Sequence, residues 1–417
     1  MKKYLNMYRI IHRLSAALFA ACGLLLSTVF LLGSAMPEQF NVVTGYDLKL
    51  NGAVKVHAQQ QQVQNLTPVA SLSPGSSYTA LLRLFGLVPI KQVTVKVVDA
   101  TTVIPCGVPF GIKMYTDGVL VVGMSDIDTS NGPKNPAKAA GMKIGDVLVK
   151  INGIPVNTIE QVSSLIEKNG GKTMNFTIRR DNITFDMRFN CEKSVNENCY
   201  KAGLWVRDSS AGIGTMTFFI PGSNVFAGLG HAVCDVDTGE ILPIASGEIV
   251  PARIYNIVRG LSGDPGELRG GFEGGTMGNL KINGETGIYG VLNKTPITGK
   301  AMPVAMKQQV KTGPAQILST IKGTVPDLYD VRIDQVRYND SSPTRNMVIV
   351  ITDEELLQKT GGIVQGMSGS PILQDGRLIG AVTHVFVNDP TRGFAIFAEN
   401  MLKTANTISI QQKTPAA

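Results

Sequence analysis

The stretch of this chain best suited to chemistry is residues 365–372, which read QGMSGSPI. A serine hydroxyl becomes an effective nucleophile once its backbone is held in a tight turn and a base takes its proton. Glycines on both sides of Ser368 permit such a turn, because glycine accepts backbone angles that other residues resist. The amides of Gly366 and Ser368 would then point together at a developing oxyanion. The stretch therefore predicts the nucleophile loop of an acyl-transfer enzyme, although an ordinary Gly/Ser turn has the same composition.

The base for such a serine is expected to be a histidine, because its pKa lies near neutrality. The chain has four histidines. His12 and His57 belong to the N-terminal region. His384 follows the serine closely in the next expected strand, so we expect it to line the substrate pocket or to pack. His231, which follows a glycine after an apolar run, is the expected base, and its alternative is a histidine in a surface turn.

A third group, usually a carboxylate, would fix the tautomer of the imidazole and stabilise the imidazolium. The two aspartates just after His231 lie too close to it along the chain. Asp353 follows an apolar run and lies fifteen positions before Ser368. The sequence TDEE at residues 352–355 also fits the start of a helix, where an aspartate caps backbone amides. From the residues alone, both interpretations of Asp353 stay open.

Composition sets the broad class. The 417 residues, 43% hydrophobic and 17% charged, suit two or three ordinary globular domains. The 45 glycines, with only 6% aromatic residues, favour turn-rich β structure. The formal charge of +7 includes four basic residues before residue 14, which leaves about +3 on the remainder. We therefore expect no nucleic-acid partner.

The N-terminus, residues 1–36, predicts a basic cytoplasmic tail followed by a transmembrane anchor. Residues 14–36 are almost wholly apolar or small, which is long enough to cross a bilayer, and the positive flank sets the orientation. A cleaved signal peptide is the alternative. The sequence SAM at residues 34–36 matches a cleavage site only loosely, so we expect an anchor that is retained at least initially. In either case most of the chain would lie outside the cytoplasm.

Residues 37–80 are predicted to form a small β-hairpin and a linker. Apolar and polar residues alternate on both sides of Asn51-Gly52, which favours a hairpin. The Gln/Ser/Pro-containing stretch at residues 59–77 has too little apolar content to pack. We expect it to be a flexible tether that lets the distal domains reach away from the membrane.

Residues 93–190 predict a compact α+β domain. The sequence NPAKAAGMKIGDVLVKINGIPV at residues 135–156 resembles the core signature of PDZ domains, in the arrangement of bacterial PDZ proteases. Such a domain binds an extended peptide by strand addition and captures its terminal carboxylate. Gly111 and Ile112 are the expected carboxylate loop. A helix opened by a Thr158 and Gln161 capping box would wall the groove.

The groove-facing residues of that helix would be Ile159 and Val162. Their alternative is to face the domain core, which we favour for Ile166. Two other residues, Cys191 and Cys199, bracket a short polar loop and could pair in an oxidising compartment.

Residues 200–404 contain many short strands separated by glycines, which favours a β-barrel or sandwich. Residues 405–417 have little apolar content, and we expect a flexible tail. The fold class is therefore mainly β with α+β: an N-terminal anchor, a PDZ domain and a β-barrel domain.

Two motifs contain the expected base and nucleophile: GHAVCD at residues 230–235 and GMSGSP at residues 366–371. The second resembles the nucleophile loop of chymotrypsin-like serine peptidases. With the N-terminal span, the PDZ signature, LFGLVP at residues 84–89 and GAVTHVFVNDPT at residues 380–391, the chain resembles the stage IV sporulation protein B (SpoIVB) peptidase family of endospore-forming bacteria.

That resemblance implies a chymotrypsin-like serine peptidase with His231 as base, Asp353 as the orienting acid and Ser368 as nucleophile. Ser370 matches the second small residue of the loop and is the less favoured nucleophile. The short interval from Asp353 to Ser368 departs from the general chymotrypsin-like pattern, in which the acid comes much earlier.

The resemblance further implies a sporulation-signalling endopeptidase that cleaves itself near its N-terminus. It would act between forespore and mother cell on a membrane-bound regulator of an intramembrane metalloprotease, leading to activation of a late sigma factor. No metal or nucleotide cofactor is indicated. The alternatives are a non-catalytic PDZ adaptor on a membrane tether and a general extracytoplasmic quality-control protease.

Overall fold

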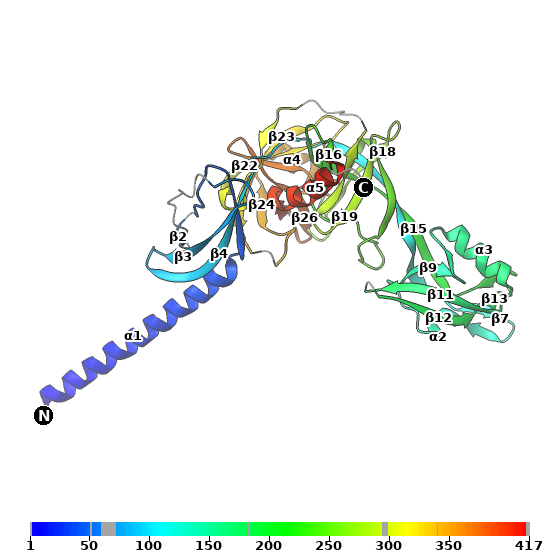
Figure 1. Ribbon diagram of the computed structural model, residues 1–417, viewed down its shortest axis with the longest axis horizontal. Coiled ribbons are helices and arrows are strands. Elements are labelled where there is room, and N and C mark those ends of the chain that lie inside the picture. Colours follow the sequence, from blue (N-terminus) through cyan, green and yellow to red (C-terminus); the bar gives the residue numbers. More distant parts are fainter. Residues whose placement is uncertain are drawn as a thin grey trace.

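The computed structural model describes residues 2–50, 52–59, 72–181, 183–293, 299–339 and 341–413. A long helix (blue) projects from one end of the molecule, and a small α+β unit (green) lies at the other end, with a two-lobed β body between them (Figure 1). The expected architecture, mainly β with an N-terminal apolar helix, an α+β unit and a β-barrel domain, is confirmed.

Helix α1 (Lys2–Ala35) contains the expected apolar span. Its segment Ile11–Ala35 has 25 residues with a mean hydropathy of 2.2. A helix of that length is about 37 Å long and exceeds the hydrocarbon thickness of about 30 Å. Its length and composition are therefore sufficient for a membrane anchor, and a signal sequence would have the same features.

An N-terminal four-stranded sheet follows α1, in the order β1-β4-β3-β2. Its strands are β1 (Gln39–Val43), β2 (Val54–Gln59), β3 (Ser77–Leu84) and β4 (Val88–Val98). Alternate residues of these strands, such as Phe40, Leu82 and Val95, are fully buried on one face. This sheet corrects the predicted domain start, because the valines from residue 93 onward belong to β4 and not to the PDZ unit.

The expected tether at residues 59–77 is also corrected. Gln59 is paired with Thr79 in antiparallel β2 and β3, so this stretch joins two neighbouring strands and separates no domains. Residues 60–71 of it lie outside the described part of the chain.

The first peptidase lobe comprises residues 102–116 and 209–303, on both sides of the PDZ unit in sequence. Two long strands, β6 and β15, run through both parts. Residues Pro109–Tyr115 of β6 pair with β15 in the lobe, whereas Leu120–Met124 pair with the start of β15 in the PDZ unit. The strands of the lobe are β5 (Thr102–Pro105), β6 (Pro109–Met124), β15 (Leu204–Ile220), β16 (Val225–Gly228), β17 (Ile244–Val258), β18 (Glu267–Phe272), β19 (Gly278–Gly284), β20 (Gly287–Leu292) and β21 (Met302–Pro303).

The PDZ unit, residues 119–207, is therefore an insertion in the first lobe. The capping box predicted from sequence is present, with Thr158 and Gln161 capping α3, and the structure also shows Asn135 as the N-cap of α2. Besides parts of β6 and β15, the unit contains β7 (Ile127–Thr129), β8 (Gly132–Lys134), α2 (Pro136–Ala139), β9 (Val147–Ile151), β10 (Ile154–Pro155), α3 (Ile159–Asn169), β11 (Thr173–Arg180), β12 (Ile183–Asn190), β13 (Glu192–Lys193) and β14 (Tyr200–Lys201). Cys191 and Cys199 are both free thiols here.

The second peptidase lobe, residues 313–397, is a closed six-stranded barrel in the order β22-β23-β24-β27-β26-β25. Its elements are β22 (Gly313–Ser319), β23 (Asp327–Val336), β24 (Met347–Ile351), α4 (Glu354–Thr360), β25 (Pro371–Gln374), β26 (Arg377–Phe386) and β27 (Asp389–Phe397). The short 3-10 helix Lys307–Gln309 links the lobes.

The predicted flexible tail is wrong for residues 405–413, because helix α5 (Ala398–Lys413) continues through them. Ala405 is fully buried and Ile408 is 4% exposed in a cluster with Phe218 and Val225 of the first lobe. The helix therefore packs across strands of both lobes (Figure 1).

Candidate active site

Ser368 lies in a loop between α4 and β25 that strand β15 holds in place. The Thr215 amide donates to the Ser368 carbonyl (3.1 Å), and the Thr215 hydroxyl donates to the Gly366 carbonyl (2.8 Å). Gly369 has φ +95°, and a Cβ there would lie 2.0 Å from the Thr215 carbonyl oxygen. Only glycine fits this close approach, so the G-x-S-G pattern is required by the packing of the two lobes.

Of the two serines in the motif, Ser368 is the accessible one. Its side chain is half-buried, and its Oγ donates to the Thr383 carbonyl at 2.7 Å. Ser370 is fully buried, and its Oγ donates to Ser319 Oγ at 2.9 Å. The arrangement favours Ser368 as the nucleophile, as the sequence predicts.

The predicted oxyanion donors have no competing acceptors. In the hydrogen bonds recorded between described residues, the amides of Gly366 and Ser368 donate to no other group. Neighbouring amides of the loop are used: Met367 donates to Val364, and Gly369 donates to Val382. Two unused backbone donors in one turn are suited to stabilising a tetrahedral oxyanion.

His231 reaches the same site from the first lobe, directly after β16. Leu229 and Gly230 both have positive φ (65° and 71°), and this conformation is unfavourable for leucine. A Cβ on Gly230 would lie 2.9 Å from Thr383 Cγ2. The chain before His231 is thus pressed against the strand whose carbonyl accepts from Ser368.

The tautomer of His231 follows from its hydrogen bond. Its Nδ1 lies 2.8 Å from the Ala232 carbonyl oxygen, which can only accept, so Nδ1 carries a proton. The other nitrogen, Nε2, is then available to take a proton from a hydroxyl. Burial lowers the pKa of His231 below its ordinary value of 6.5, which keeps the ring neutral and able to act as a base at pH 7.

His384 joins this site, although its closeness in sequence to Ser368 argued against a direct part. Its ring centroid lies 5.0 Å from that of His231. Its Nδ1 is buried and has no hydrogen-bond partner. Burial, then the nearby His231 and Arg345, lower the pKa of His384 to about 4. No sequence signal indicated this pairing, because it depends on β26 meeting the end of β16 across the two lobes.

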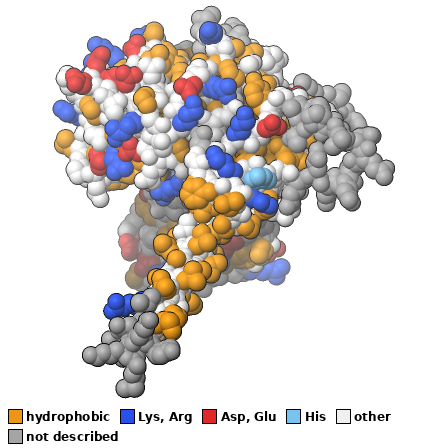
Figure 2. Space-filling view, turned by 90° about the vertical axis from the view of Figure 1, so that its left-hand side faces the viewer, with side chains coloured by type: hydrophobic (Ala, Val, Ile, Leu, Met, Phe, Trp, Pro, Cys, Tyr) orange, Lys and Arg blue, Asp and Glu red, His pale blue; other side chains and the backbone are white. Residues whose placement is uncertain are grey.

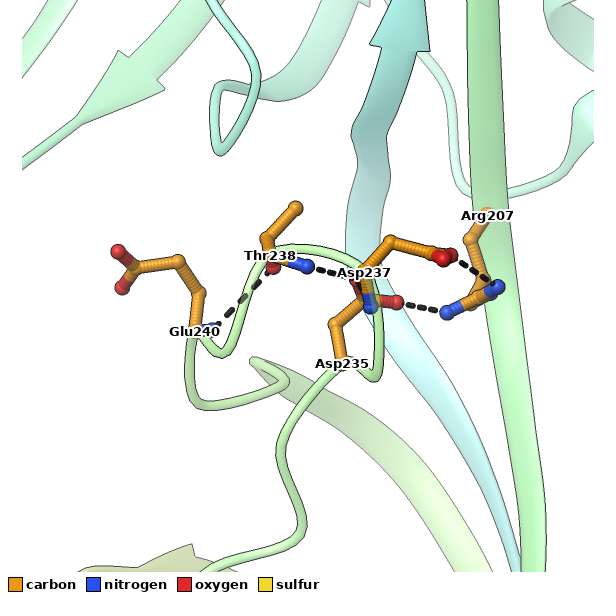
Figure 3. Close-up of polar contacts among 5 residues, drawn as sticks. All are labelled: Arg207, Asp235, Asp237, Thr238 and Glu240. Atoms are coloured by element: carbon orange, nitrogen blue, oxygen red, sulfur yellow. Dashed lines mark hydrogen bonds and ion pairs between the residues drawn. The ribbon is translucent and has the colours of Figure 1, made fainter.

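An ion-paired cluster secures the loop that follows His231 (Figure 3). Arg207 of β15 pairs with the buried Asp235 and, at 2.8 Å, with Asp237. The Asp235 carboxylate also accepts from the amides of Asp237 (3.1 Å) and Thr238 (2.9 Å). The two aspartates near His231 therefore stabilise its loop, and none of these contacts reaches the imidazole.

Asp353 is the N-cap residue of α4. Its Oδ1 accepts from the Leu356 amide (2.8 Å), and its Oδ2 accepts from the Asp330 amide (3.3 Å). Within the described chain, no recorded contact joins Asp353 to His231. The geometry supports the capping interpretation, and the orienting role stays a prediction.

Substituting Asp353 distinguishes the two roles. Asparagine caps a helix about as well as aspartate, so Asp353→Asn should keep kcat/KM within a few-fold, whereas Asp353→Ala should lower the free energy of unfolding by about 1 kcal/mol. The measurements are peptide hydrolysis and urea unfolding of both variants. A fall in kcat/KM of roughly 10⁴-fold in Asp353→Asn, with unchanged unfolding, would instead assign the orienting role to the carboxylate.

The predicted PDZ carboxylate loop is wrong. Gly111 and Ile112 lie in β6 within the first lobe, where they pair with β15 and β17. Ile112 is 4% exposed and belongs to the core of that lobe. A Cβ on Gly111 would lie 2.4 Å from the ring of Phe272. These residues therefore face packed side chains and not a peptide groove.

The helix predicted to wall the groove is present as α3, but its three apolar residues differ in exposure. Ile159 is 36% exposed, and its amide donates to the Asp208 carboxylate of β15 at 2.9 Å. Val162 and Ile166 are each 5% exposed and pack in the PDZ core, which agrees with the alternative interpretation. Of these three side chains, Ile159 alone has a substantial exposed surface.

The strand beside α3 is the first part of β15, which sequence reasoning missed. One edge of Leu204–Arg207 pairs with β6, and no described strand pairs with the other edge. Trp205 is 63% exposed, and Gly203, with φ +81°, precedes it in a turn. The sequence AGLW at residues 202–205, a glycine at the start of a strand, could have indicated this edge. It was missed because it follows the PDZ signature in the chain instead of preceding it.

Comparisons with known proteins give matches to parts of the chain. The magnetosome formation protease MamE of Paramagnetospirillum magneticum (strain ATCC 700264 / AMB-1) is 34% identical over 76 residues, which are 18% of this chain and 9% of MamE. This match thus spans less than a tenth of that relative. The Rv3671c protease of M. tuberculosis in its active form is 15% identical and covers 48% of this chain and 74% of its own, with a TM-score of 0.27. Its inactive form covers 47% and 84%, with 15% identity and a TM-score of 0.26.

Family models match two parts of the chain. Residues 128–180 match a PDZ domain, inside the inserted unit. Residues 198–402 match the SpoIVB peptidase S55 family, a range that contains His231, Ser368 and His384. The chain is therefore a serine peptidase that carries a PDZ domain, and its peptidase domain matches the SpoIVB peptidase S55 family.

Proposed function

We propose that this serine peptidase is a membrane-anchored signalling endopeptidase of sporulation. It cleaves itself near its N-terminus and then cuts a membrane-bound regulator of an intramembrane metalloprotease, in the space between forespore and mother cell, so that a late sigma factor is activated. The observation that supports the catalytic part is that the segment before His231 packs against Thr383, whose carbonyl accepts from Ser368 Oγ, beside two unused amides. The apolar helix α1 supports the membrane setting.

Hydrolysis would follow acyl transfer. Ser368 Oγ attacks the scissile carbonyl carbon while His231 Nε2 takes the hydroxyl proton, and the amides of Gly366 and Ser368 receive the oxyanion. The C–N bond then breaks, and His231 returns the proton to the leaving amine. A water molecule, deprotonated by the same nitrogen, releases the acyl group and restores the serine.

We further propose that the PDZ unit binds a peptide along the free edge of Leu204–Arg207, opposite α3, with the turn at Gly203 receiving its terminal carboxylate. The same strand, β15, continues to Thr215, which holds the Ser368 loop by two hydrogen bonds. Arg207, within the groove edge, holds the loop after His231. Peptide binding in the groove would therefore act on both catalytic segments through one strand.

Selective cleavage is the property that tests this function. The full-length enzyme, reconstituted in vesicles, should cut itself and a co-reconstituted membrane regulator at a few positions, and it should release processing of a sigma-factor precursor by the metalloprotease. Unfolded casein should be cut at least about 100-fold more slowly, because specificity rests on differential binding of the transition state. Comparable rates on casein would favour the quality-control alternative. Absence of any self-cleavage by active enzyme would contradict the signalling proposal.

A further inference from the structure

The turn that joins β3 to β4 carries two strongly exposed apolar side chains, Phe85 (72% exposed) and Leu87 (78% exposed). Phe85 and Gly86 both have positive φ, 51° and 79°, as a type I′ turn requires. Asparagine or aspartate is favoured at the first of these positions, and an aromatic residue there is unfavourable. Neither the packing of the sheet nor the chemistry of the turn therefore accounts for Phe85.

The β3–β4 turn lies on the side of the sheet where α1 ends. Strand β1 continues from α1 and pairs in parallel with β4, beginning with Gln39 opposite Thr94, so the start of β4 points back toward α1. A Cβ on Gly33, in the last turn of α1, would lie 3.7 Å from the Ile90 carbonyl oxygen. The β3–β4 turn projects from the body on the same side as α1 (Figure 1).

Polar contacts between β4 and the chain begin where the apolar segment of α1 ends. Lys91 donates to the Met36 carbonyl and pairs with Glu38, both at 2.8 Å, just after the apolar segment that ends at Ala35. Leu87 precedes Ile90 by three residues, which places it about 10 Å from Ile90 along β4. Because Ile90 lies beside Gly33 in the apolar segment of α1, the turn is within reach of a bilayer that holds this segment.

Basic side chains flank the turn. Lys55 of β2 and Arg83 of β3 are directly paired across the strands, and like charges in such positions are destabilising. Neither forms an ion pair with any described residue, and Arg83 Nε is buried without a hydrogen-bond partner. Lys and Arg side chains gather where the apolar helix meets the body (Figure 2). Anionic headgroups would neutralise this pair.

We propose that the turn at residues 85–87 is a second membrane contact, in which Phe85 and Leu87 insert into the bilayer that holds α1 while Lys55 and Arg83 bind anionic headgroups. Apolar burial and basic charge together give reversible surface binding. The contact would keep the catalytic body at the membrane after cleavage had separated it from α1.

Tryptophan quenching tests insertion directly, because the chain contains one tryptophan, Trp205 in the PDZ unit. In full-length protein carrying Trp205→Phe and Leu87→Trp, reconstituted in phosphatidylglycerol vesicles, lipids brominated on the acyl chain should quench the new tryptophan strongly. The otherwise unchanged chain, with Trp205 alone, is the matched control and should show little quenching. Equal, weak quenching of both would overturn the proposal.

A flotation experiment tests retention without a new tryptophan. A recognition site for a sequence-specific protease, inserted between Met36 and Pro37 of vesicle-bound protein, allows α1 to be cut away. The remaining body should float with anionic vesicles, and Phe85→Ser with Leu87→Ser should reduce its partitioning at least about tenfold. Val325→Ser with Leu328→Ser, a pair of exposed apolar residues on the second lobe, is the control and should not. Release of the unaltered body from the vesicles would contradict insertion. Equal retention of the body on neutral and anionic vesicles would contradict headgroup binding.

Discussion

Replacing Ser368 with alanine should abolish peptide hydrolysis, with kcat lower by roughly 10⁶-fold. The reason is chemical: the Oγ that forms the acyl-enzyme is removed, while the two oxyanion amides and the loop contacts with Thr215 stay in place. Labelling by a serine-directed fluorophosphonate and self-cleavage should be lost together. Because the side chain is only half-buried, the thermal midpoint should change little.

Ser370→Ala is the matched control within the same loop. Ser370 is fully buried and donates to Ser319, so its loss should lower the free energy of unfolding by about 1 kcal/mol. Labelling at Ser368 should continue. If Ser370→Ala removed labelling while Ser368→Ala kept it, the assignment of the nucleophile would be reversed.

The sequence predicted those parts of the fold whose signals are local. The capping box of Thr158 and Gln161 could be predicted because a cap depends on neighbouring residues. The insertion of the PDZ unit into the first lobe was not, because β6 and β15 pair across roughly a hundred residues of chain and each strand serves two domains. Strand partners are set by tertiary packing, and Gly111 was misplaced for this reason.

The candidate site divides in the same way. Gly366, Ser368 and Gly369 form one local turn, and their spacing alone predicts a nucleophile loop. The contact between His231 and His384 joins two lobes and leaves no pattern in either segment. Asp353 had two local interpretations, and only the structure shows that its carboxylate also accepts from the distant Asp330 amide.

Replacing His231 with alanine should lower kcat as severely as Ser368→Ala does, and the double variant should be no worse than either single one, because nucleophile and base act as a unit. The pH dependence of kcat/KM should be distinctive. Burial lowers the pKa of His231 below its ordinary value of 6.5, so the imidazole stays neutral to a lower pH than a free histidine does. The acid limb of the kcat/KM profile should therefore lie below pH 6.5. An acid limb above pH 6.5 would contradict a buried neutral base.

The same shifts make folding stability depend on pH. Above pH 6.5, both His231 and His384 are neutral whether the chain is folded or unfolded, so they add no slope. As the pH falls from 6.5 toward about 4, the unfolded chain binds protons that the folded site, with the pKa of His384 near 4, does not accept, and stability should fall. Urea unfolding of Ser368→Ala, which cannot digest itself, measures this slope. In His384→Phe on that background the slope should decrease, because Phe cannot titrate. An unchanged slope would mean that the pKa of His384 is not lowered in the folded chain, which would contradict its burial beside His231.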